Sequence, residues 1–257
     1  MRVSFFVAGM QKSGTTALDR YLRTHPDIEM ASKKEAHFFD DEALDWSAPD
    51  YGRLSALFNP GYTGKVRGEA TPIYTYWPQC LERIRHYNPD ARLIVCLRHP
   101  AYRAFSHWKM ETIRGAETLS FADAISASGR RRVSEAPGSV HRVYSYVERG
   151  LYAAQVTRMF ALFPRRQILF IKTDDLWCDA GATLDTIYTF LGLPAMPAPE
   201  RAYTVPVDSS SLGRLPAGER DTLDGLFRDD IVATSALAGL DLGDWLRGDY
   251  AEMPSKG

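Results

Sequence analysis

The stretch VSFFVAGMQKSGTT, residues Val3–Thr16, decides the fold of this chain. Val3–Ala8 is an apolar run rich in aromatic and β-branched residues, which is typical of a buried strand. A short loop with two glycines and one lysine follows over Gly9–Gly14. From Thr15 the apolar spacing of the sequence predicts an amphipathic helix that stops at Pro26. A strand, a glycine loop and a helix N-terminus together predict an anion site, because the free N–H groups and the helix dipole point into the loop.

The position of the lysine excludes the commonest ligand of such a loop. A loop that binds a nucleoside triphosphate places Lys directly after its second Gly, followed by a Ser or Thr for magnesium. Here Thr15 and Thr16 follow Gly14, and Lys12 lies inside the loop. We therefore expect a shorter anion, which Lys12 approaches from the loop side. The alternative is a tight strand-to-helix turn with a solvated lysine.

The amino-acid composition limits which class of protein this chain can be and which partners it can bind. The chain has 257 residues, 45% of them apolar, which is enough for one well-packed domain. Its 31 Lys and Arg nearly balance 32 Asp and Glu, so we expect neither nucleic acid nor a membrane surface as partner. Three widely spaced cysteines indicate a reducing compartment, and no apolar run is long enough to span a membrane. We expect a soluble, cytoplasmic protein, whose oligomeric state the sequence leaves open.

Apolar runs alternate with amphipathic stretches along most of the chain. Further strands are expected at 27–30, 65–70, 92–97 and 167–172. Helices are expected near 50–58, 79–87, 101–113, 121–126, 151–163, 182–191, 217–227 and 234–239. The alternation predicts the α/β class: a single P-loop-like domain over residues 1–257, with a central, mostly parallel sheet flanked by helices. Ligands should then bind at the carboxyl ends of the strands.

A second cationic segment follows the strand at 92–97. Nucleotide hydrolases that use magnesium typically place an aspartate for the metal at the end of a second strand. This strand instead ends at Arg98, and Arg103 and Ser106 follow one helical turn apart. A cation and a hydroxyl suit a second phosphate group, without a metal. The alternative is a helix start with surface arginines.

At this point the chain resembles the sulfotransferases that use 3′-phosphoadenosine 5′-phosphosulfate (PAPS). GMQKSGTT is similar to their 5′-phosphosulfate loop, and LRHPAYRAFS to their 3′-phosphate segment. Lys34–Phe39 (KEAHFF) and Glu69–Tyr74 (EATPIY) resemble segments of the heparan-sulfate-type branch. Further similar segments are Gly150–Tyr152 and Ile168–Leu176. The resemblance covers roughly residues 3–193.

The resemblance implies a role for each segment. It assigns the 5′ end of the donor to Gln11, Lys12, Ser13, Gly14, Thr15 and Thr16. Arg98 and Ser106 would hold the 3′-phosphate, with the Arg98 guanidinium able to form a bidentate fork. Lys12 would also be catalytic, because it can neutralise charge that builds on the bridging oxygen as the sulfur–oxygen bond breaks.

Two residues compete for the role of catalytic base. Glu35 is preferred, because the local pattern resembles the branch of the family that uses a glutamate. His37 is the rival, since an imidazole has a suitable pKa and another branch uses a histidine. An exposed carboxylate in a charge-rich segment is the alternative interpretation of Glu35. Phe38 and Phe39 are expected to be core residues.

The C-terminal region departs from the family pattern. Members usually carry a basic, glycine-containing loop there that closes over the nucleotide, and Ser209–Arg214 is a shortened candidate, with Gly213 and Arg214 as its nucleotide contacts. The expected reaction is in-line, metal-independent transfer of a sulfuryl group from PAPS to a hydroxyl, in preference to an amine. The acceptor would be a small molecule or carbohydrate, and 3′-phosphoadenosine 5′-phosphate (PAP) the second product. The alternatives are a P-loop nucleotide kinase and a non-catalytic nucleotide-binding module, and the sequence does not identify the acceptor.

Overall fold

A computed structural model describes residues 2–197 and 210–252 of the chain. These residues form two compact units. The described part of unit 1 comprises residues 2–97 and 159–197, and that of unit 2 comprises 98–158 and 210–252. The single domain expected over residues 1–257 stays a prediction.

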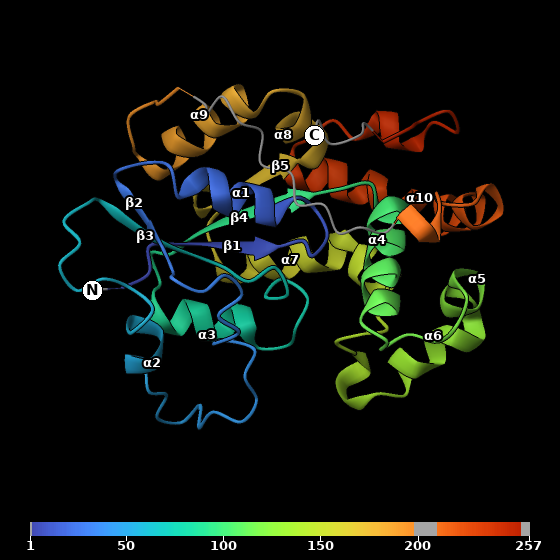
Figure 1. Cartoon of the computed structure of the whole chain (residues 1–257), viewed down its shortest axis with the longest axis horizontal. Coiled ribbons are helices and arrows are strands. Elements are labelled where there is room, and N and C mark those ends of the chain that lie inside the picture. Colours follow the sequence, from blue (N-terminus) through green and yellow to red (C-terminus); the bar gives the residue numbers. More distant parts are fainter. Residues whose placement is uncertain (1, 198–209, 253–257) are drawn as a thin grey trace. The chain divides into compact units, whose positions relative to one another are not determined.

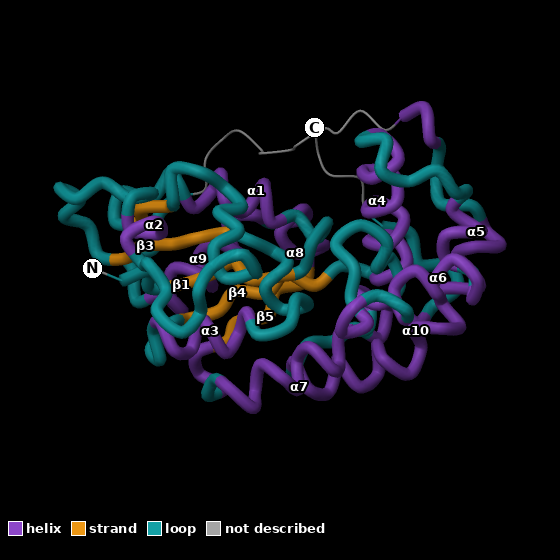
Figure 2. Tube along the Cα trace, turned by 90° about the horizontal axis from the view of Figure 1, so that it is seen from below, coloured by secondary structure: helices purple, strands orange, loops and turns teal. Residues whose placement is uncertain are grey.

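A parallel sheet forms the centre of unit 1 (Figures 1 and 2). Its described strands are β1 (Phe5–Gly9), β2 (Ile28–Met30), β3 (Val66–Ala70), β4 (Arg92–Leu97) and β5 (Ile168–Lys172). The strand order is β2-β3-β1-β4-β5, and every neighbouring pair is parallel. The first strand in sequence thus lies in the middle of the sheet, between β3 and β4. The predicted α/β class and the predicted strands are confirmed, each within two residues of its expected ends.

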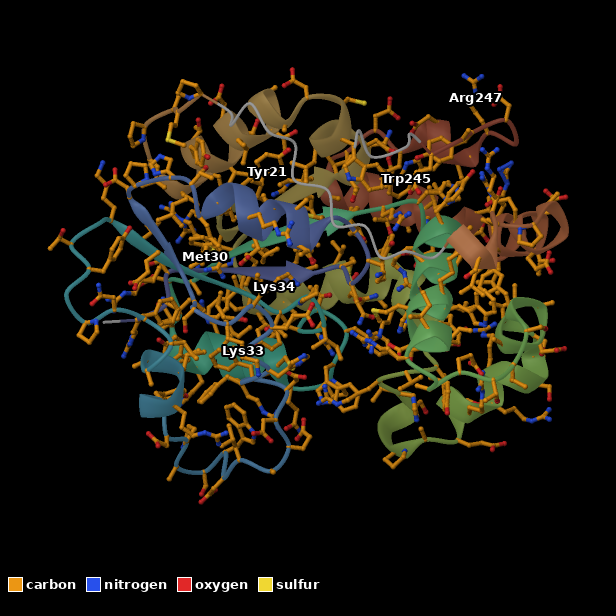
Figure 3. All side chains as sticks on the ribbon, in the orientation of Figure 1. Tyr21, Met30, Lys33, Lys34, Trp245 and Arg247 are labelled. Atoms are coloured by element: carbon orange, nitrogen blue, oxygen red, sulfur yellow. The ribbon has the colours of Figure 1, made fainter. Side chains whose placement is uncertain are left out.

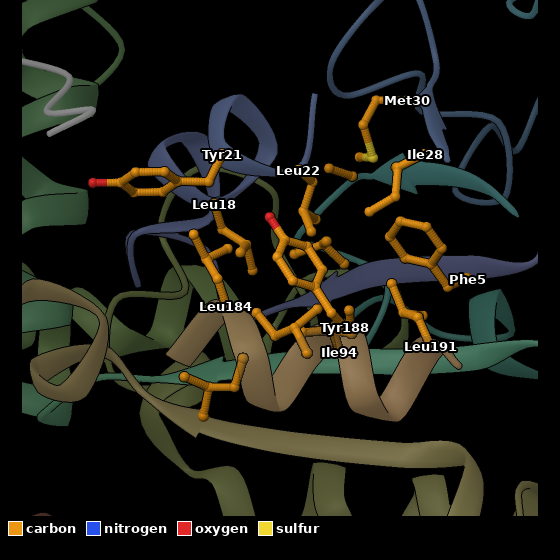
Figure 4. Close-up of a cluster of buried hydrophobic side chains, with 14 of the residues drawn as sticks. Phe5, Leu18, Tyr21, Leu22, Ile28, Met30, Ile94, Leu184, Tyr188 and Leu191 are labelled. Atoms are coloured by element: carbon orange, nitrogen blue, oxygen red, sulfur yellow. The ribbon is translucent and has the colours of Figure 1, made fainter. Parts of the chain in front are cut away.

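One face of the sheet packs against helices α1 (Thr15–Leu22), α8 (Thr173–Cys178) and α9 (Ala180–Leu191). Figure 4 shows this cluster, in which Leu18 and Leu22 of α1 and Leu184 and Tyr188 of α9 lie against the strands. Ile94 of β4 is wholly buried there. The alternation of side chains along a strand explains the pattern, because every second residue of a central strand points to this face.

The other face carries α3 (Cys80–Tyr87), as Figure 1 shows. A cluster of aromatic side chains packs there as well. The ring of Phe6 lies edge-on to Phe39, with 5.5 Å between ring centroids. Phe39 also packs edge-on against Tyr74 at 5.7 Å. Phe38 and Phe39 are both buried, as the sequence predicts. These two aromatic residues anchor the far end of the segment that follows β2, in which Lys33 and Lys34 are labelled in Figure 3.

Unit 2 is helical in its described residues. Its helices are α4 (Pro100–Ile113), α5 (Phe121–Ile125), α6 (Ala127–Ser134) and α10 (Ala217–Ala238), while α7 (Tyr152–Leu162) contains residues of both units. The short α2 (Gly52–Ser55) belongs to unit 1.

One sequence prediction about these helices is wrong. The two helices expected at 217–227 and 234–239 are one helix, α10, because no glycine or proline interrupts the chain between Leu226 and Gly239. The arginine run 130–132 lies in α6. Arg130 pairs there with Glu148 at 2.8 Å, and Arg132 with the buried Glu117 at 2.8 Å. Long-range ion pairs of this kind leave no local signal in a sequence.

Candidate active site

The glycine loop connects the carboxyl end of β1 to helix α1. The Met10 N–H donates a hydrogen bond to the carbonyl of Cys96 on β4 (2.9 Å), and the Ser13 N–H donates to the Met10 carbonyl (3.2 Å). The Thr173 hydroxyl at the start of α8 donates to the Ser13 carbonyl (3.0 Å). Neighbouring elements of unit 1 therefore fix the loop backbone.

The loop has the backbone pattern of an anion-binding nest. Lys12 and Gly14 have left-handed φ angles of 68° and 79°, and Ser13 between them does not. Such alternation turns successive N–H groups toward one side. A left-handed lysine costs about 1–3 kcal/mol, which the fixed ends of the loop must offset. No described side chain caps α1, so the first N–H groups of the helix are available to an anion.

The side chain of Ser13 supplies the test of fit for a phosphosulfate. Ser13 is wholly buried, and its Oγ has no hydrogen-bond partner within residues 2–197 and 210–252. An unpaired buried hydroxyl costs about 1–3 kcal/mol, which a bound anionic oxygen would recover. The loop residues predicted from the sequence are therefore suited to the 5′ end of PAPS. They are Gln11, Lys12, Ser13, Gly14, Thr15 and Thr16.

Four ionisable side chains meet in the segment after β2. The Lys34 Nζ lies 2.7 Å from Glu35 Oε1, and the other carboxylate oxygen of Glu35 lies 3.7 Å from His37 Nε2. The opposite ring nitrogen of His37, Nδ1, lies 2.9 Å from Asp40 Oδ2. Glu35 and His37 are partly exposed, whereas the Asp40 side chain is only 1% exposed. The structure thus places the two candidate bases beside each other and adds Asp40, which the sequence analysis did not assign.

The pKa values separate the two candidates. The hydrogen bond from His37 and the nearby Lys34 lower the pKa of Glu35 to about 2, although burial opposes them. The hydrogen bond to Asp40, followed by that to Glu35, raises the pKa of His37 to about 9. At neutral pH His37 is therefore an imidazolium, which cannot accept a proton, and Glu35 is a carboxylate, which can.

In unit 2 the Arg98 guanidinium binds a carboxylate. Its Nε and Nη2 each donate to one oxygen of Glu252, both at 2.5 Å. The two side chains are 15% and 12% exposed. Burial lowers the pKa of Arg98, but the Glu252 charge outweighs burial and the pKa lies above its ordinary value. Arg98 thus forms the bidentate fork that was expected for a phosphate, with Glu252 as the anion. Nothing in the local sequence around either residue indicates this pairing.

Other predicted residues of the 3′-phosphate site lie in the same unit. Ser106 is partly buried on α4. One turn further along, Lys109 has a lowered pKa because of burial and then the charge of Arg98. The Lys109 Nζ also donates to the carbonyl of Gly213, which joins the predicted C-terminal loop to this group. Arg214 is exposed, and Ser209 lies outside the described residues.

Arg103 lies on α4 one turn before Ser106, as the sequence predicts. Its side chain is wholly buried and donates to the carbonyl of Tyr146. A buried guanidinium needs acceptors within the protein, and a carbonyl in unit 2 supplies one. Arg103 therefore stabilises unit 2 internally.

Within residues 2–197 and 210–252, no group of three or more His, Cys, Asp or Glu side chains is arranged to hold a metal ion. None of the helices in the described ranges is long and apolar enough to span a bilayer.

A parallel α/β sheet with a glycine loop after its first strand defines a P-loop-like protein that binds an anion. The sulfotransferase domain family model matches residues 3–205. The chain is 32% identical over 190 residues to heparan sulfate glucosamine 3-O-sulfotransferase 6 of Mus musculus, covering 73% of this chain and 51% of that protein. It is 30% identical over 190 residues to the human 3-O-sulfotransferase 3B1, covering 73% and 45% of the two chains. The chain thus spans about half the length of the curated relatives.

A solved structure agrees over nearly the whole chain. A sulfotransferase from Alicyclobacillus acidocaldarius is 30% identical, with a TM-score of 0.80, and the match covers 96% of this chain and all of that one. The sulfotransferase domain from the curacin biosynthetic pathway, 15% identical with a TM-score of 0.55, shares the fold.

The chain belongs to the sulfotransferase domain family. The predicted membership of the PAPS-dependent family, related to its heparan-sulfate branch, is confirmed. The nucleotide kinase and the non-catalytic module are not favoured.

Proposed function

We propose that this protein transfers a sulfuryl group from PAPS to a hydroxyl group of a carbohydrate. The observation that carries the proposal is the position of the Glu35 carboxylate, with Lys34 Nζ at 2.7 Å from one oxygen and His37 Nε2 at 3.7 Å from the other. The hydroxyl is preferred to an amine because the relatives are named as 3-O-sulfotransferases that act on heparan sulfate glucosamine. A small-molecule acceptor is the broader alternative within the same chemistry.

The proposed donor contacts are those of the two segments that the sequence predicts for the 5′ and the 3′ end of PAPS. In unit 1 the N–H groups and hydroxyls of the glycine loop would bind the phosphosulfate, with Ser13 Oγ donating to an anionic oxygen. In unit 2 Arg98 would bind the 3′-phosphate through the two N–H groups that now bind Glu252, with Ser106 as a second donor. Gly213 and Arg214 would form the nucleotide-closing loop.

The proposed transfer needs a base and a counter-charge. Glu35 removes the proton of the acceptor hydroxyl while the hydroxyl oxygen forms a bond to sulfur. At the same time the bond from sulfur to the bridging phosphate oxygen breaks. PAP leaves with the electron pair of that bond, and Lys12 neutralises the charge that builds on the bridging oxygen. His37 takes no proton in this scheme, because Asp40 and Glu35 hold it as an imidazolium. Its role is to orient Glu35.

The remaining parts of the proposal concern organisation and location. We propose that residues 1–257 function as one sulfotransferase domain without a metal, so excess EDTA should leave turnover unchanged. A cytoplasmic location is supported by the three cysteines, none of which forms a disulfide. Fractionation of cells that express the protein tests the location.

Turnover of labelled PAPS with a panel of polysaccharide and small-molecule acceptors tests the function. Glu35→Gln keeps the shape of the side chain and removes its basicity, so turnover should fall by about 10²–10⁴-fold while PAP binding persists. His37→Ala should reduce turnover less. Glu82→Gln, at an exposed position on α3, is the matched control and should behave as wild type. A nearly active Glu35→Gln together with an inactive His37→Ala would move the base to His37.

A further inference from the structure

The turn that carries Glu35 and His37 has a strained backbone. Glu35 has a φ angle of 57° and His37 one of 53°, both in the left-handed region that favours glycine. Each such residue costs about 1–3 kcal/mol and persists only where its surroundings hold it. Two of them within three positions therefore require specific support.

Strand β3 and the residues after it supply that support within unit 1. The Glu35 N–H donates to the carbonyl of Ala70, the last residue of β3, at 2.9 Å. The next two N–H groups bond to side chains: Ala36 donates to Glu69 Oε1 at 3.3 Å, and His37 donates to Thr71 Oγ1 at 3.4 Å. Three consecutive amides of the turn are thus bound by three consecutive residues, Glu69, Ala70 and Thr71.

The two side chains of this clamp are joined to each other. The Thr71 hydroxyl donates to Glu69 Oε1 at 2.5 Å, which leaves its lone pairs to accept from His37. Glu69 and Thr71 are both wholly buried. Burial, opposed by the hydrogen bond from Thr71, raises the pKa of Glu69 to about 7. A buried carboxyl is costly, and a leucine or valine would fill the same interior without that cost.

We propose that Glu69 and Thr71 are positioning residues for sulfuryl transfer, because they fix the turn that places Glu35 against His37. The inference rests on the proposed role of Glu35 as base. Neither side chain would touch the donor or the acceptor. They act through the backbone of residues 35–37, and a displacement of about 1 Å in a catalytic group can cost about 10²-fold in rate.

The matched pair Thr71→Val and Thr71→Ser tests this role. Valine keeps the shape of threonine and removes the hydroxyl, whereas serine keeps the hydroxyl. We expect Thr71→Val to lower kcat by about 10- to 100-fold with the KM for PAPS unchanged, and Thr71→Ser to stay within a few-fold of wild type. NMR titration of the His37 ring gives a second readout. Its pKa should fall from about 9 toward its ordinary value of 6.5 in Thr71→Val only, because the ring leaves Asp40 and Glu35.

A second pair at Glu69 covers the case in which Thr71→Val does not fold. Glu69→Gln keeps an oxygen that accepts from Ala36 and Thr71, so it should retain most of the activity, whereas Glu69→Met should behave like Thr71→Val. Variants that lose thermal stability but keep the wild-type kcat and the raised His37 pKa would show a purely structural role and overturn the proposal. A different result would contradict the proposed role of Glu35 as base: full turnover by Glu35→Gln, whatever the His37 titration shows.

Discussion

The ion pair between Arg98 and Glu252 predicts that Glu252→Gln will bind PAP more tightly than wild type. The carboxylate uses Nε and Nη2 of Arg98, the edge of the guanidinium that a 3′-phosphate would bind as a fork. Both anions cannot occupy these donors at once. Binding of the nucleotide must therefore displace Glu252, and the free energy of that contact is subtracted from the affinity.

The magnitude follows from the geometry of the pair. Hydrogen bonds to charged groups contribute about 1.5–3 kcal/mol, and exposed ion pairs much less. The Arg98 and Glu252 side chains are only 15% and 12% exposed, so the contribution of this pair lies near the range for hydrogen bonds to charged groups. Replacing the carboxylate by an amide leaves Arg98 with a neutral partner, which a phosphate displaces at little cost. We expect PAP to bind about 10- to 100-fold more tightly.

Calorimetric titration distinguishes this effect from a general one. PAP and adenosine 5′-phosphate are titrated into wild type and Glu252→Gln, since the second ligand lacks the 3′-phosphate and should gain nothing. Glu219→Gln, in the first turn of α10, is the matched control within unit 2. Equal gains for both ligands, or no gain for PAP in a variant whose thermal stability is that of wild type, would refute the assignment of Arg98 to the 3′-phosphate.

Three further predictions concern Lys12, Ser106 and His37. Lys12→Ala should lower turnover by about 10²–10³-fold in single-turnover assays while weakening PAP binding only slightly, because the lysine charge is needed mainly in the transition state. A Lys12→Ala variant with a rate within a few-fold of wild type would show that Lys12 takes no part in the transfer step. Ser106→Ala should weaken PAP binding about tenfold and leave adenosine 5′-phosphate unaffected, and the same calorimetric comparison decides it. The pKa of His37 is raised to about 9, so its pairing contributes fully to stability below pH 6.5 and is lost as the pH rises through about 9. Urea unfolding of wild type and His37→Ala should therefore differ at pH 6 and converge by pH 10, and a difference that grows with pH would contradict the assignment.

The fold was predictable because its signals are local. After Arg92, the run at 93–97 is apolar throughout, as a strand covered on both faces must be, and it forms most of β4 in the interior of the sheet. The glycine loop could also be predicted from the sequence. Its first residue, Gly9, ends β1, and a Cβ atom there would lie 2.6 Å from the Thr75 hydroxyl, so only glycine fits. Each of these features depends on residues within one segment or on a contact that only glycine permits.

The contacts of the site were less predictable because they join distant segments. Glu252 lies 154 residues from Arg98, and no periodicity or spacing relates the two. Glu69 lies 33 residues from Ala36, although the sequence did place Glu69 in a segment that resembles the family. In both cases the meeting depends on the path of the chain through its unit, which a single sequence does not contain.

The choice between Glu35 and His37 depends on Asp40, for which the sequence did hold a signal. Phe38 and Phe39 were expected in the core, and a carboxylate that directly follows two core residues cannot easily reach water. A buried carboxylate such as that of Asp40 needs a partner of opposite charge. The nearest residue that can become a cation is His37, three residues earlier. That pairing predicts that His37 is an imidazolium, in agreement with the pKa of about 9 that its hydrogen bond to Asp40 gives it. In the proposed reaction the same pairing leaves Glu35 to accept the proton, so the burial of Phe39 next to Asp40 bears on which residue is proposed as the base.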